Sequence, residues 1–275
     1  MHFAPKYRNK VTSYYSKKKI WITGASSGIG EQLAIQLSAT DATLILSARR
    51  KDELDRVRSM CKNPESVFVV PLDLSIESSV REAFELVKAT VGDIDILFNN
   101  GGISQRSTVL QTPLDLERKM FEINFFSNIL LSKLVAESMV AKNSGHLVIT
   151  SSLLGKWGFP LRASYSASKH ALHGYYESMR MELEQQGIFI TLVTPGFVAT
   201  EISLNSFNEK GDRTNEMDNN QATGLAASEC AKKILQGVSS QKKEFAIGGK
   251  EVKGILVKRL FPALFEKLLR KSPSR

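Results

Sequence analysis

Short apolar runs of strand length recur along the chain, and longer segments with helical periodicity separate them. The runs that predict strands are Lys19 to Thr23, Thr43 to Ser47, Val67 to Pro71, Ile94 to Phe98, His146 to Ser151, Phe189 to Val193 and Glu244 to Ile247. The segments that predict helices lie near Gly28 to Ser38, Lys51 to Met60, Ile76 to Thr90, Pro113 to Ala141, Tyr165 to Gln185 and Ser228 to Gly237. Strict alternation of the two predicts an α/β fold with a doubly wound parallel sheet of about seven strands and helices on both faces.

No internal repeat or low-complexity linker divides the chain, so we predict one domain over residues 19–250. A basic extension, residues 1–18, precedes it, and a basic amphipathic extension, residues 251–275, belongs to the same domain. The stretch from Asn205 to Gly224 is rich in Asn, Gly, Asp and Thr and breaks the alternation. We interpret it as a mobile loop at the carboxyl ends of the strands, where sheets of this kind bind ligands.

The composition is that of an ordinary globular protein, with 42% hydrophobic and 24% charged residues among 275. This excludes collagen-like, disordered and disulfide-scaffold chains. No apolar run is long enough for a membrane span, and the first 19 residues contain no apolar signal core, so we expect neither. The two cysteines, Cys61 and Cys230, follow no metal-ligand spacing. A cytoplasmic location is therefore expected, because free thiols are typical of reducing compartments.

The net charge of +9 is concentrated at the two ends of the chain. Residues 1–19 contain six basic residues and no acid, and residues 250–275 contain eight basic residues against Glu251 and Glu266. Each end therefore carries +6, which leaves −3 for the body between them. A slightly acidic body lacks the continuous basic face that nucleic acid binding requires, so nucleic acid is not an expected partner.

A glycine-rich turn directly follows the first predicted strand and opens the first predicted helix. Its sequence is Thr23-Gly24-Ala25-Ser26-Ser27-Gly28-Ile29-Gly30. Glycines let the backbone approach a pyrophosphate closely, and the amides at a helix N-terminus present donors and a positive dipole end to it. Because a strand and a helix flank this turn, we favour a dinucleotide cradle over a tight turn without a ligand. Contacts to the cofactor are expected from Gly24, Ser26, Ser27, Gly28, Ile29 and Gly30.

The residue at the end of the second strand distinguishes NAD from NADP in Rossmann-type folds. That position holds Arg49, followed by Arg50, and offers no carboxylate to a ribose 2′-hydroxyl. A guanidinium pairs with a 2′-phosphate through charge-assisted hydrogen bonds. The sequence therefore favours NADP(H) over NAD(H), with a solvated arginine pair at a helix entry as the alternative.

Tyr165 and Lys169 are four residues apart in a predicted helix and share one of its faces. A tyrosine hydroxyl has a pKa near ~10, so it is a poor base at neutral pH unless a cation stabilises its phenolate. Lowering that pKa by about 3 units requires roughly 4 kcal/mol, which Lys169 and an oxidised nicotinamide could supply together. Such a pair is common in helices, so its meaning depends on the surrounding motifs.

Those motifs follow the ends of the predicted strands. They are Asp73-Leu74 after the third strand, Asn99-Asn100-Gly101-Gly102 after the fourth, Thr150-Ser151-Ser152 at the fifth and Pro195-Gly196 after the sixth, with Asn124 inside the long fourth helix. Over roughly residues 18–250 this pattern, with the spacing TGxxxGxG in the glycine-rich turn, resembles the classical short-chain dehydrogenase/reductase family. The segments 155–160, 165–172 and 261–265 resemble its dehydrogenase/reductase member 7 subgroup.

The resemblance implies a role for each matching residue. Tyr165 would exchange a proton with a substrate oxygen that Ser152 hydrogen-bonds, and Lys169 would hold the nicotinamide ribose and lower the pKa of Tyr165. Asn124 would interrupt its helix and bind a water that connects Lys169 to solvent. Further cofactor contacts would come from Asp73 and Leu74 at the adenine, Asn100 at the ribose, Gly101, Pro195, Gly196, and Thr200 at the carboxamide. The family usually has alanine where Gly101 stands, which bears on the tightness of binding and not on the chemistry.

The expected activity is hydride transfer between nicotinamide and a lipophilic carbonyl or alcohol by Tyr-Lys-Ser-Asn chemistry. Candidate substrate contacts are mostly apolar and lie near the loop of residues 205–224; they are Ser104, Leu153, Trp157, Phe159, Phe197 and Val198.

Two alternatives stay open. One is a 3-ketoacyl carrier-protein reductase, although the long C-terminal extension argues against it. The other is a catalytically silent cofactor- or lipid-binding protein, although all four catalytic residues are present. No metal is expected, because tyrosine-based proton transfer needs none, although His170, His173 and Glu177 could share a helical face.

The C-terminal segment combines apolar and basic residues at helical spacing, with Pro262 expected to break or restart the helix. The apolar positions are Val252, Ile255, Leu256, Leu260, Leu264 and Leu268. Packing of this side on the protein's own body or on a second subunit is favoured, because homodimers and homotetramers are common in the family. Contact with an anionic membrane surface is the alternative.

Overall fold

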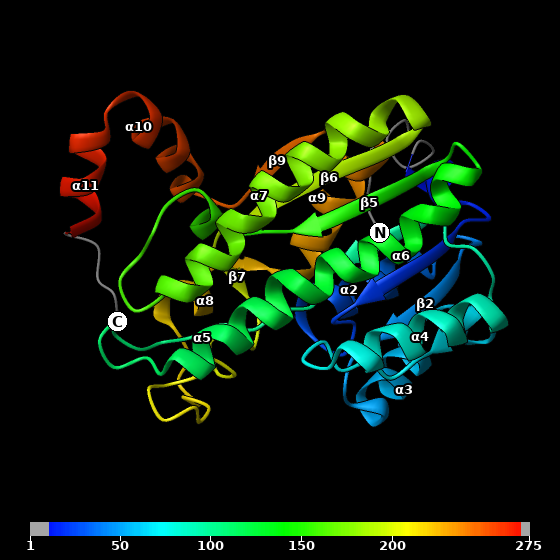
Figure 1. The fold of residues 1–275 in the computed structure, drawn as a ribbon, viewed down its shortest axis with the longest axis horizontal. Helices are drawn as coiled ribbons and strands as arrows, with labels where there is room; N and C mark the ends of the chain where they lie inside the picture. Colours follow the sequence, from blue (N-terminus) through cyan, green and yellow to red (C-terminus); the bar gives the residue numbers. More distant parts are fainter. Residues whose placement is uncertain (1–10, 271–275) are drawn as a thin grey trace.

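A sheet of seven parallel strands forms the centre of the molecule (Figure 1). The computed structural model describes residues 11–270. The strand order is β3-β2-β1-β4-β5-β6-β9, and every pair is parallel. The strands are β1 (Lys19–Thr23), β2 (Thr43–Ser47), β3 (Val67–Val69), β4 (Ile96–Asn99), β5 (Gly145–Thr150), β6 (Ile188–Pro195) and β9 (Glu244–Ile247). The direction of winding reverses between β1 and β4, which confirms the doubly wound fold predicted from the sequence.

Helices cover both faces of this sheet and enclose two separate cores. α2 (Gly28–Leu37), α3 (Lys51–Met60) and α9 (Ala227–Ser239) pack on one face. α4 (Glu77–Thr90), α6 (Ser127–Ala141) and α7 (Ala163–Leu183) pack on the other. Successive strand residues point to opposite faces, so Ile20 and Ile22 enter the first core and Trp21 the second. Short 3-10 turns cover Pro64–Ser66, Leu153–Gly155 and Glu184–Gln186.

The helix predicted over residues 113–141 is interrupted. It consists of α5 (Leu114–Phe121), a π-helical turn (Glu122–Phe126) and α6. Asn124 lies in the π turn, fully buried, and its side-chain amide bonds both backbone groups of Ile103. A single π turn inside an α-helix commonly marks a functional position, so Asn124 is a candidate functional residue.

Residues 200–224, called the covering loop below, are mostly irregular. The loop contains α8 (Asn219–Ala222), and the short pair β7 (Val198–Ala199) and β8 (Leu225–Ala226) flanks it. The sequence did not predict this pair. Two backbone hydrogen bonds of Phe207, to Ser104 and Arg106, hold the loop against the segment after β4.

The C-terminal helices project from one end of the molecule (Figure 1). They are α10 (Gly254–Leu260) and α11 (Pro262–Arg270), preceded by a 3-10 turn at Lys250–Lys253. Pro262 begins α11, because proline lacks a backbone N–H and is tolerated in the first turn of a helix. Glu251 Oε1 accepts hydrogen bonds from Gly249 N at 2.9 Å and Phe197 N at 3.4 Å, which fastens this segment to the turn after β6. Of the helices in the described chain, none has the length and apolarity needed to cross a bilayer.

Candidate active site

The glycine-rich turn after β1 is packed too closely for side chains. Gly24 and Gly28 have positive φ angles of 64° and 58°, which favour glycine. A Cβ on Gly24 would lie 2.7 Å from Gly101 Cα, and one on Gly30 would lie 2.2 Å from Gly24 O. The absence of side chains at these glycines therefore lets the turn pack directly against the residues after β4 and against the start of α2.

The residues at the ends of β1, β4 and β5 are joined by hydrogen bonds. Thr23 Oγ1 accepts bonds from Asn100 N and Gly101 N, each at 3.0 Å. Asn100 Nδ2 donates to Thr23 O at 3.3 Å, and Thr150 Oγ1 donates to Asn100 Oδ1 at 3.3 Å. Asn100 thus orients the floor of the site. A Cβ on Gly101 would lie 2.6 Å from Leu74 Cδ1, so glycine at this position leaves room for that side chain.

One cavity of about 620 Å³ lies at the carboxyl ends of the strands. It is lined by all but two of the residues predicted for the site: Gly24, Ser26, Ser27, Gly28, Ile29, Arg49, Asp73, Leu74, Asn100, Gly101, Ser152, Tyr165, Lys169, Pro195, Gly196 and Thr200. Gly30 is instead covered by Gly24, and Asn124 is buried behind the wall. Every predicted substrate contact also lines the cavity, from Ser104 to Val198.

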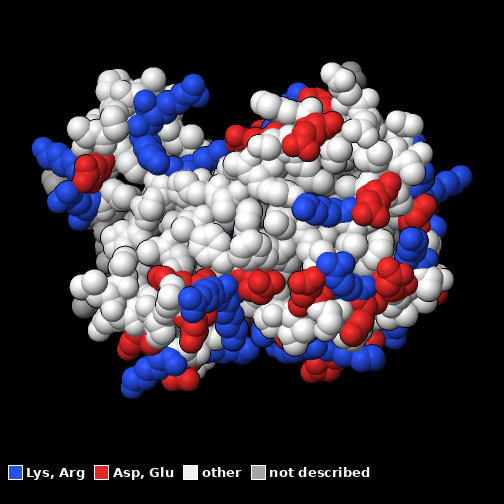
Figure 2. All heavy atoms as spheres, viewed as in Figure 1, with Lys and Arg blue, Asp and Glu red and all other residues white. Residues whose placement is uncertain are grey.

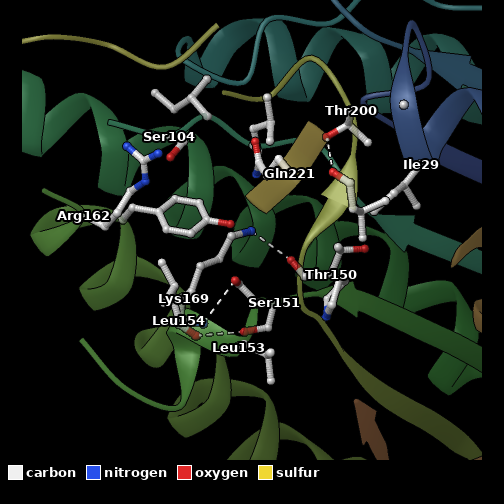
Figure 3. A pocket seen from close by; sticks show the side chains of 18 of the residues that line it. Ile29, Ser104, Thr150, Ser151, Leu153, Leu154, Arg162, Lys169, Thr200 and Gln221 are labelled. Atoms are coloured by element: carbon white, nitrogen blue, oxygen red, sulfur yellow. Dashed lines mark hydrogen bonds between the residues drawn. The ribbon is translucent and has the colours of Figure 1, made fainter. Parts of the chain in front are cut away.

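The two ends of the cavity have different chemistry (Figure 3). Ile29, at the start of α2, lies near Thr200. The opposite side of the cavity holds Lys169, Ser104 and Arg162. The Ser27 side chain makes no capping bond to α2, so the first amides of that helix are not satisfied by it. Arg49 and Arg50 are exposed at the cavity rim, and the described chain forms no ion pair with either.

Tyr165, Ser152 and Lys169 meet at the other end. Lys169 is 4% exposed, and its Nζ donates to Thr150 O at 2.9 Å and lies 5.8 Å from the centre of the Tyr165 ring (Figure 3). The side chain of Ser152 lies close enough to Tyr165 to lower the pKa of its hydroxyl. Ser152 also begins a 3-10 turn, where its Oγ accepts a bond from Leu154 N at 3.1 Å. The segment after β5 and the first two turns of α7 therefore bring these three side chains together.

Burial controls the proton affinity of both titratable groups. It raises the pKa of Tyr165, although the hydrogen bond with Ser152 and the charge of Arg162 offset part of this rise. It lowers the pKa of Lys169 to about 8. For Tyr165, desolvation of a phenolate exceeds the attraction of the neighbouring charges, whereas the lowering expected from the sequence required both Lys169 and an oxidised nicotinamide.

Asn124 supports this group from behind. Its Oδ1 accepts a bond from Ile103 N at 2.8 Å, and its Nδ2 donates to Ile103 O at 3.0 Å and to Ser168 Oγ at 3.1 Å. These contacts connect the loop after β4 with α7 beside Lys169. The side chain of Asn124 thus fixes the position of the loop after β4 relative to α7.

A second buried group lies beneath the site. Ser151 Oγ lies 2.9 Å from His173 Nε2 and donates to Lys169 O at 3.2 Å. Lys156 Nζ lies 3.1 Å from His173 Nδ1 and 2.7 Å from Glu244. His173, Glu177 and Glu244 could approach one ion, but the Lys156 ammonium already supplies a cation there. His170 does not join them, because its Nδ1 faces Ser166 O at 2.7 Å.

Arg162 is a site residue that the sequence analysis missed. It is half-buried in the cavity wall, bonds Gln105 O, and lies 3.6 Å from Asp218 of the covering loop. Gln105 Oε1 in turn accepts a bond from Tyr165 N at 3.2 Å. Arg162 stands three residues before Tyr165, on the same side of the start of the helix, and this spacing could have predicted that it belongs to the site.

The cavity also extends to the C-terminal helices. Val257, Phe265 and Leu269 line it, and the Phe265 ring lies 5.2 Å from the ring of Trp157. No local pattern connects residues this far apart along the chain. These contacts were therefore missed as well.

Comparison with known proteins agrees with this geometry. The family described as short chain dehydrogenase matches residues 18–211. A Drosophila melanogaster "dehydrogenase/reductase SDR family protein 7-like" is 35% identical, with 95% of this chain and 81% of that protein covered. The human "dehydrogenase/reductase SDR family member 7" is 40% identical, with 82% of this chain and 68% of that protein covered.

Two solved structures share the fold. A short-chain dehydrogenase/reductase from Burkholderia phymatum in complex with NAD has a TM-score of 0.80 at 21% identity and covers 95% of this chain and 98% of its own. A serine dehydrogenase complexed with NADP+ has a TM-score of 0.74 at 20% identity and covers 84% of this chain and 94% of its own. The chain therefore belongs to the short-chain dehydrogenase/reductase family of nicotinamide-binding oxidoreductases, and within that family it resembles the member 7 subgroup.

Proposed function

We propose that the protein is an NADP(H)-dependent oxidoreductase that interconverts a lipophilic carbonyl compound and its alcohol. The observation that carries this proposal is one cavity that joins a glycine cradle and the Arg49 side chain to the group of Tyr165, Ser152 and Lys169. Both halves of a hydride-transfer site would thus share a single space.

The residues at the α2 end fit a nicotinamide dinucleotide. The close approach at Gly24 and the uncapped start of α2 suit a pyrophosphate. Arg49 would hold the 2′-phosphate, since no acid stands beside it to hold a 2′-hydroxyl instead. The remaining contacts would be Ser26, Ser27, Gly28 and Ile29 at the phosphates, Asp73 and Leu74 at the adenine, Asn100 and Gly101 at the ribose, and Pro195, Gly196 and Thr200 at the nicotinamide. When bound, the cofactor supplies or accepts the hydride.

Tyr165 would transfer the proton. Because burial raises the pKa of Tyr165, its phenol is protonated at neutral pH and suited to donate a proton to the oxygen of a carbonyl under reduction. Ser152 would hold the same oxygen. Lys169, with a pKa of about 8, would then exchange a proton near neutral pH, while Asn124 keeps the surrounding walls in place.

The substrate half of the cavity supports a lipophilic compound. Leu153, Trp157, Phe159, Phe197 and Val198 line it, together with apolar residues of α10 and α11. Apolar lining with a few convergent polar groups is typical of sites for small molecules. Buried free thiols at Cys61 and Cys230 fit a cytoplasmic enzyme, and we propose a homodimer or homotetramer.

A panel of lipophilic aldehydes, ketones and alcohols, followed by the absorbance of reduced nicotinamide, tests this function. We expect NADPH oxidation with at least one lipophilic carbonyl and little with NADH. Tyr165→Phe should lower turnover by ~10² or more, because it removes the proton donor and keeps the ring. Ser166→Ala, one residue further along the same helix, is the matched control. Retention of more than about a tenth of the activity by Tyr165→Phe would contradict the proposed chemistry.

A further inference from the structure

We infer that the outer surface of α10 and α11 docks on an anionic lipid membrane. We call this surface the docking face; it consists of the exposed apolar residues Leu256, Leu260, Phe261, Leu264 and Leu268 and the basic residues around them. The inference concerns a binding surface, so it does not depend on the proposed catalytic activity.

The apolar part of the docking face is exposed to solvent. Each of its five side chains is between 49% and 61% exposed, and all lie within 13 consecutive residues, 256–268. In α11, Leu264 and Leu268 follow the spacing i, i+4, which aligns them along one side of the helix, and Phe261 directly precedes this helix. A contiguous apolar patch of this kind marks an interaction surface.

Basic residues surround this patch. Residues 250–270 contain six basic residues against Glu251 and Glu266, a net charge of +4. Figure 2 shows basic side chains gathered over α10 and α11 at the projecting end of the molecule. Glu266 pairs with Arg270 and Glu251 caps the preceding turn, whereas Lys253, Arg259 and Lys267 form no ion pair within residues 11–270. The unneutralised charge of the face is therefore positive.

This combination favours a membrane over a second copy of the chain. A two-fold dimer through the docking face would place the same patch on both subunits, so lysine and arginine would meet lysine and arginine. An anionic bilayer instead offers acyl chains to the leucines and phosphates to the basic side chains. Complementary charge therefore favours an anionic bilayer over a second copy of the chain as the partner of the docking face.

The inner side of the same helices connects this surface to the cavity. Val257, Phe265 and Leu269 are partly buried and line it, and Trp157 contacts both Phe265 and Gly254. Leu268 and Lys253 of the docking face also border the cavity. One pair of helices therefore contributes both to the docking face and to the cavity wall. Docking would bring the cavity next to the bilayer, so a substrate dissolved in the membrane would reach it without crossing water.

Vesicle co-sedimentation of the full chain tests the inference. We expect binding to vesicles of phosphatidylcholine mixed with phosphatidylserine, weak binding to phosphatidylcholine alone, and loss of binding in high salt, because salt screens exposed charges. Lys253→Gln and Lys267→Gln should each weaken binding about fivefold, which corresponds to about 1 kcal/mol for one basic residue near an anionic surface. Lys133→Gln, which removes an exposed charge from α6, is the control.

The apolar contribution is tested with Leu260→Ser combined with Leu264→Ser. Both side chains are already exposed, so folding should be retained while vesicle binding falls at least tenfold. The control combines Leu110→Ser with Met181→Ser, at apolar residues that are 98% and 83% exposed elsewhere on the surface. Equal loss in the control pair would contradict a specific docking face.

A spectroscopic probe gives a second, independent measurement. Phe261→Trp should shift its emission to shorter wavelength on addition of anionic vesicles, and Leu110→Trp should not. Absence of both sedimentation and shift would overturn the inference. So would a change from oligomer to monomer in the Leu260→Ser, Leu264→Ser variant, because the face would then be covered by a second copy.

Discussion

Lys169 is a charged group that the fold buries at a cost in stability. The pKa of Lys169 is lowered by burial to about 8 from an ordinary value of 10.5, so at pH 7 the folded protein must hold an ammonium that the unfolded chain hydrates better. Because the folded pKa is the lower one, this opposition to folding is complete below pH 8 and disappears as the pH rises toward 10.5. An apolar residue at this position is therefore compatible with the fold and incompatible with the proposed chemistry.

We predict that Lys169→Met raises the free energy of unfolding at pH 7 by about 1 to 3 kcal/mol while it abolishes turnover. The advantage should shrink between pH 8 and pH 10.5. Urea unfolding at several pH values measures this, with Lys133→Met on α6 as an exposed control. A variant that is less stable than wild type at pH 7 would mean that the bond from Lys169 Nζ to Thr150 O outweighs the desolvation.

Arg49 is expected to determine the choice of cofactor. Arg49→Ala should weaken NADPH binding about tenfold or more, since a charge-assisted contact contributes roughly 1.5 to 3 kcal/mol. NADH binding should change little, because it has no 2′-phosphate. Fluorescence titration of both reduced cofactors provides the measurement, and Lys51→Ala, an exposed neighbour paired with Asp55, provides the control. Equal weakening of both cofactors would contradict the assignment.

At the scale of elements, an ion pair between Arg162 and Asp218, whose side chains are largely buried, holds the covering loop to the start of α7. Asp218 also caps α8 by accepting a bond from Asn220 N at 2.9 Å, and asparagine can cap equally well. Asp218→Asn therefore removes the charge that faces Arg162 and keeps the cap. We predict that the loop opens more often, so that trypsin cleaves at Lys210 and Arg213 several-fold faster. Asp212→Asn in the same loop is the control, and unchanged cleavage would show that the other contacts of the loop, such as those of Phe207 and Glu216, hold it closed.

Several elements were predictable because their cause is local. Strands buried on both faces are continuous apolar runs, and all seven were found from such runs. β3 ends at Val69 and not at Pro71, although Val70 N and Leu72 N still donate to Leu46 O and Ala48 O, each at 3.0 Å. The interruption of the helix at Asn124 was expected only from the family resemblance, because local spacing does not reveal a side chain that bonds the backbone of Ile103, distant in sequence.

The same distinction holds for the site. The glycine cradle and the pair of Tyr165 and Lys169 each lie within one short segment, so sequence spacing was enough to find them. Arg162 with Asp218, and Trp157 with Phe265, meet only through tertiary packing. The contribution of burial to the pKa of Tyr165 could not be predicted from the sequence, because burial is a property of the whole fold and not of the helix that carries the residue.

At the scale of the whole molecule, two buried histidines connect stability to pH. Burial lowers the pKa of His146 to about 3, and burial followed by the charge of Lys156 lowers the pKa of His173 to about 4. Since an unfolded histidine titrates near ~6.5, the unfolded chain binds more protons below that pH. Stability is therefore lost as the pH falls from 6.5 toward 4.

We predict a loss of about 1.4 kcal/mol per pH unit for each histidine over this range. His146→Asn and His173→Asn should each flatten the dependence of the urea midpoint on pH. The exposed His170, changed to asparagine, serves as the control. A slope that neither substitution changes would assign the acid sensitivity to carboxyl groups instead.

Glu251 gives the docking face a connection to the cofactor site. Its carboxylate holds Gly249 and Phe197 together, so it lies between the C-terminal helices and the turn that carries Pro195, Gly196 and Thr200. Coupling between two binding sites is thermodynamically reciprocal. Any factor by which vesicles change the affinity for the dinucleotide must equal the factor by which the dinucleotide changes the affinity for vesicles. The partition of the protein between membrane and water would then depend on the concentration of its cofactor. Glu251 would be the residue that transmits this dependence from the cofactor site to the docking face.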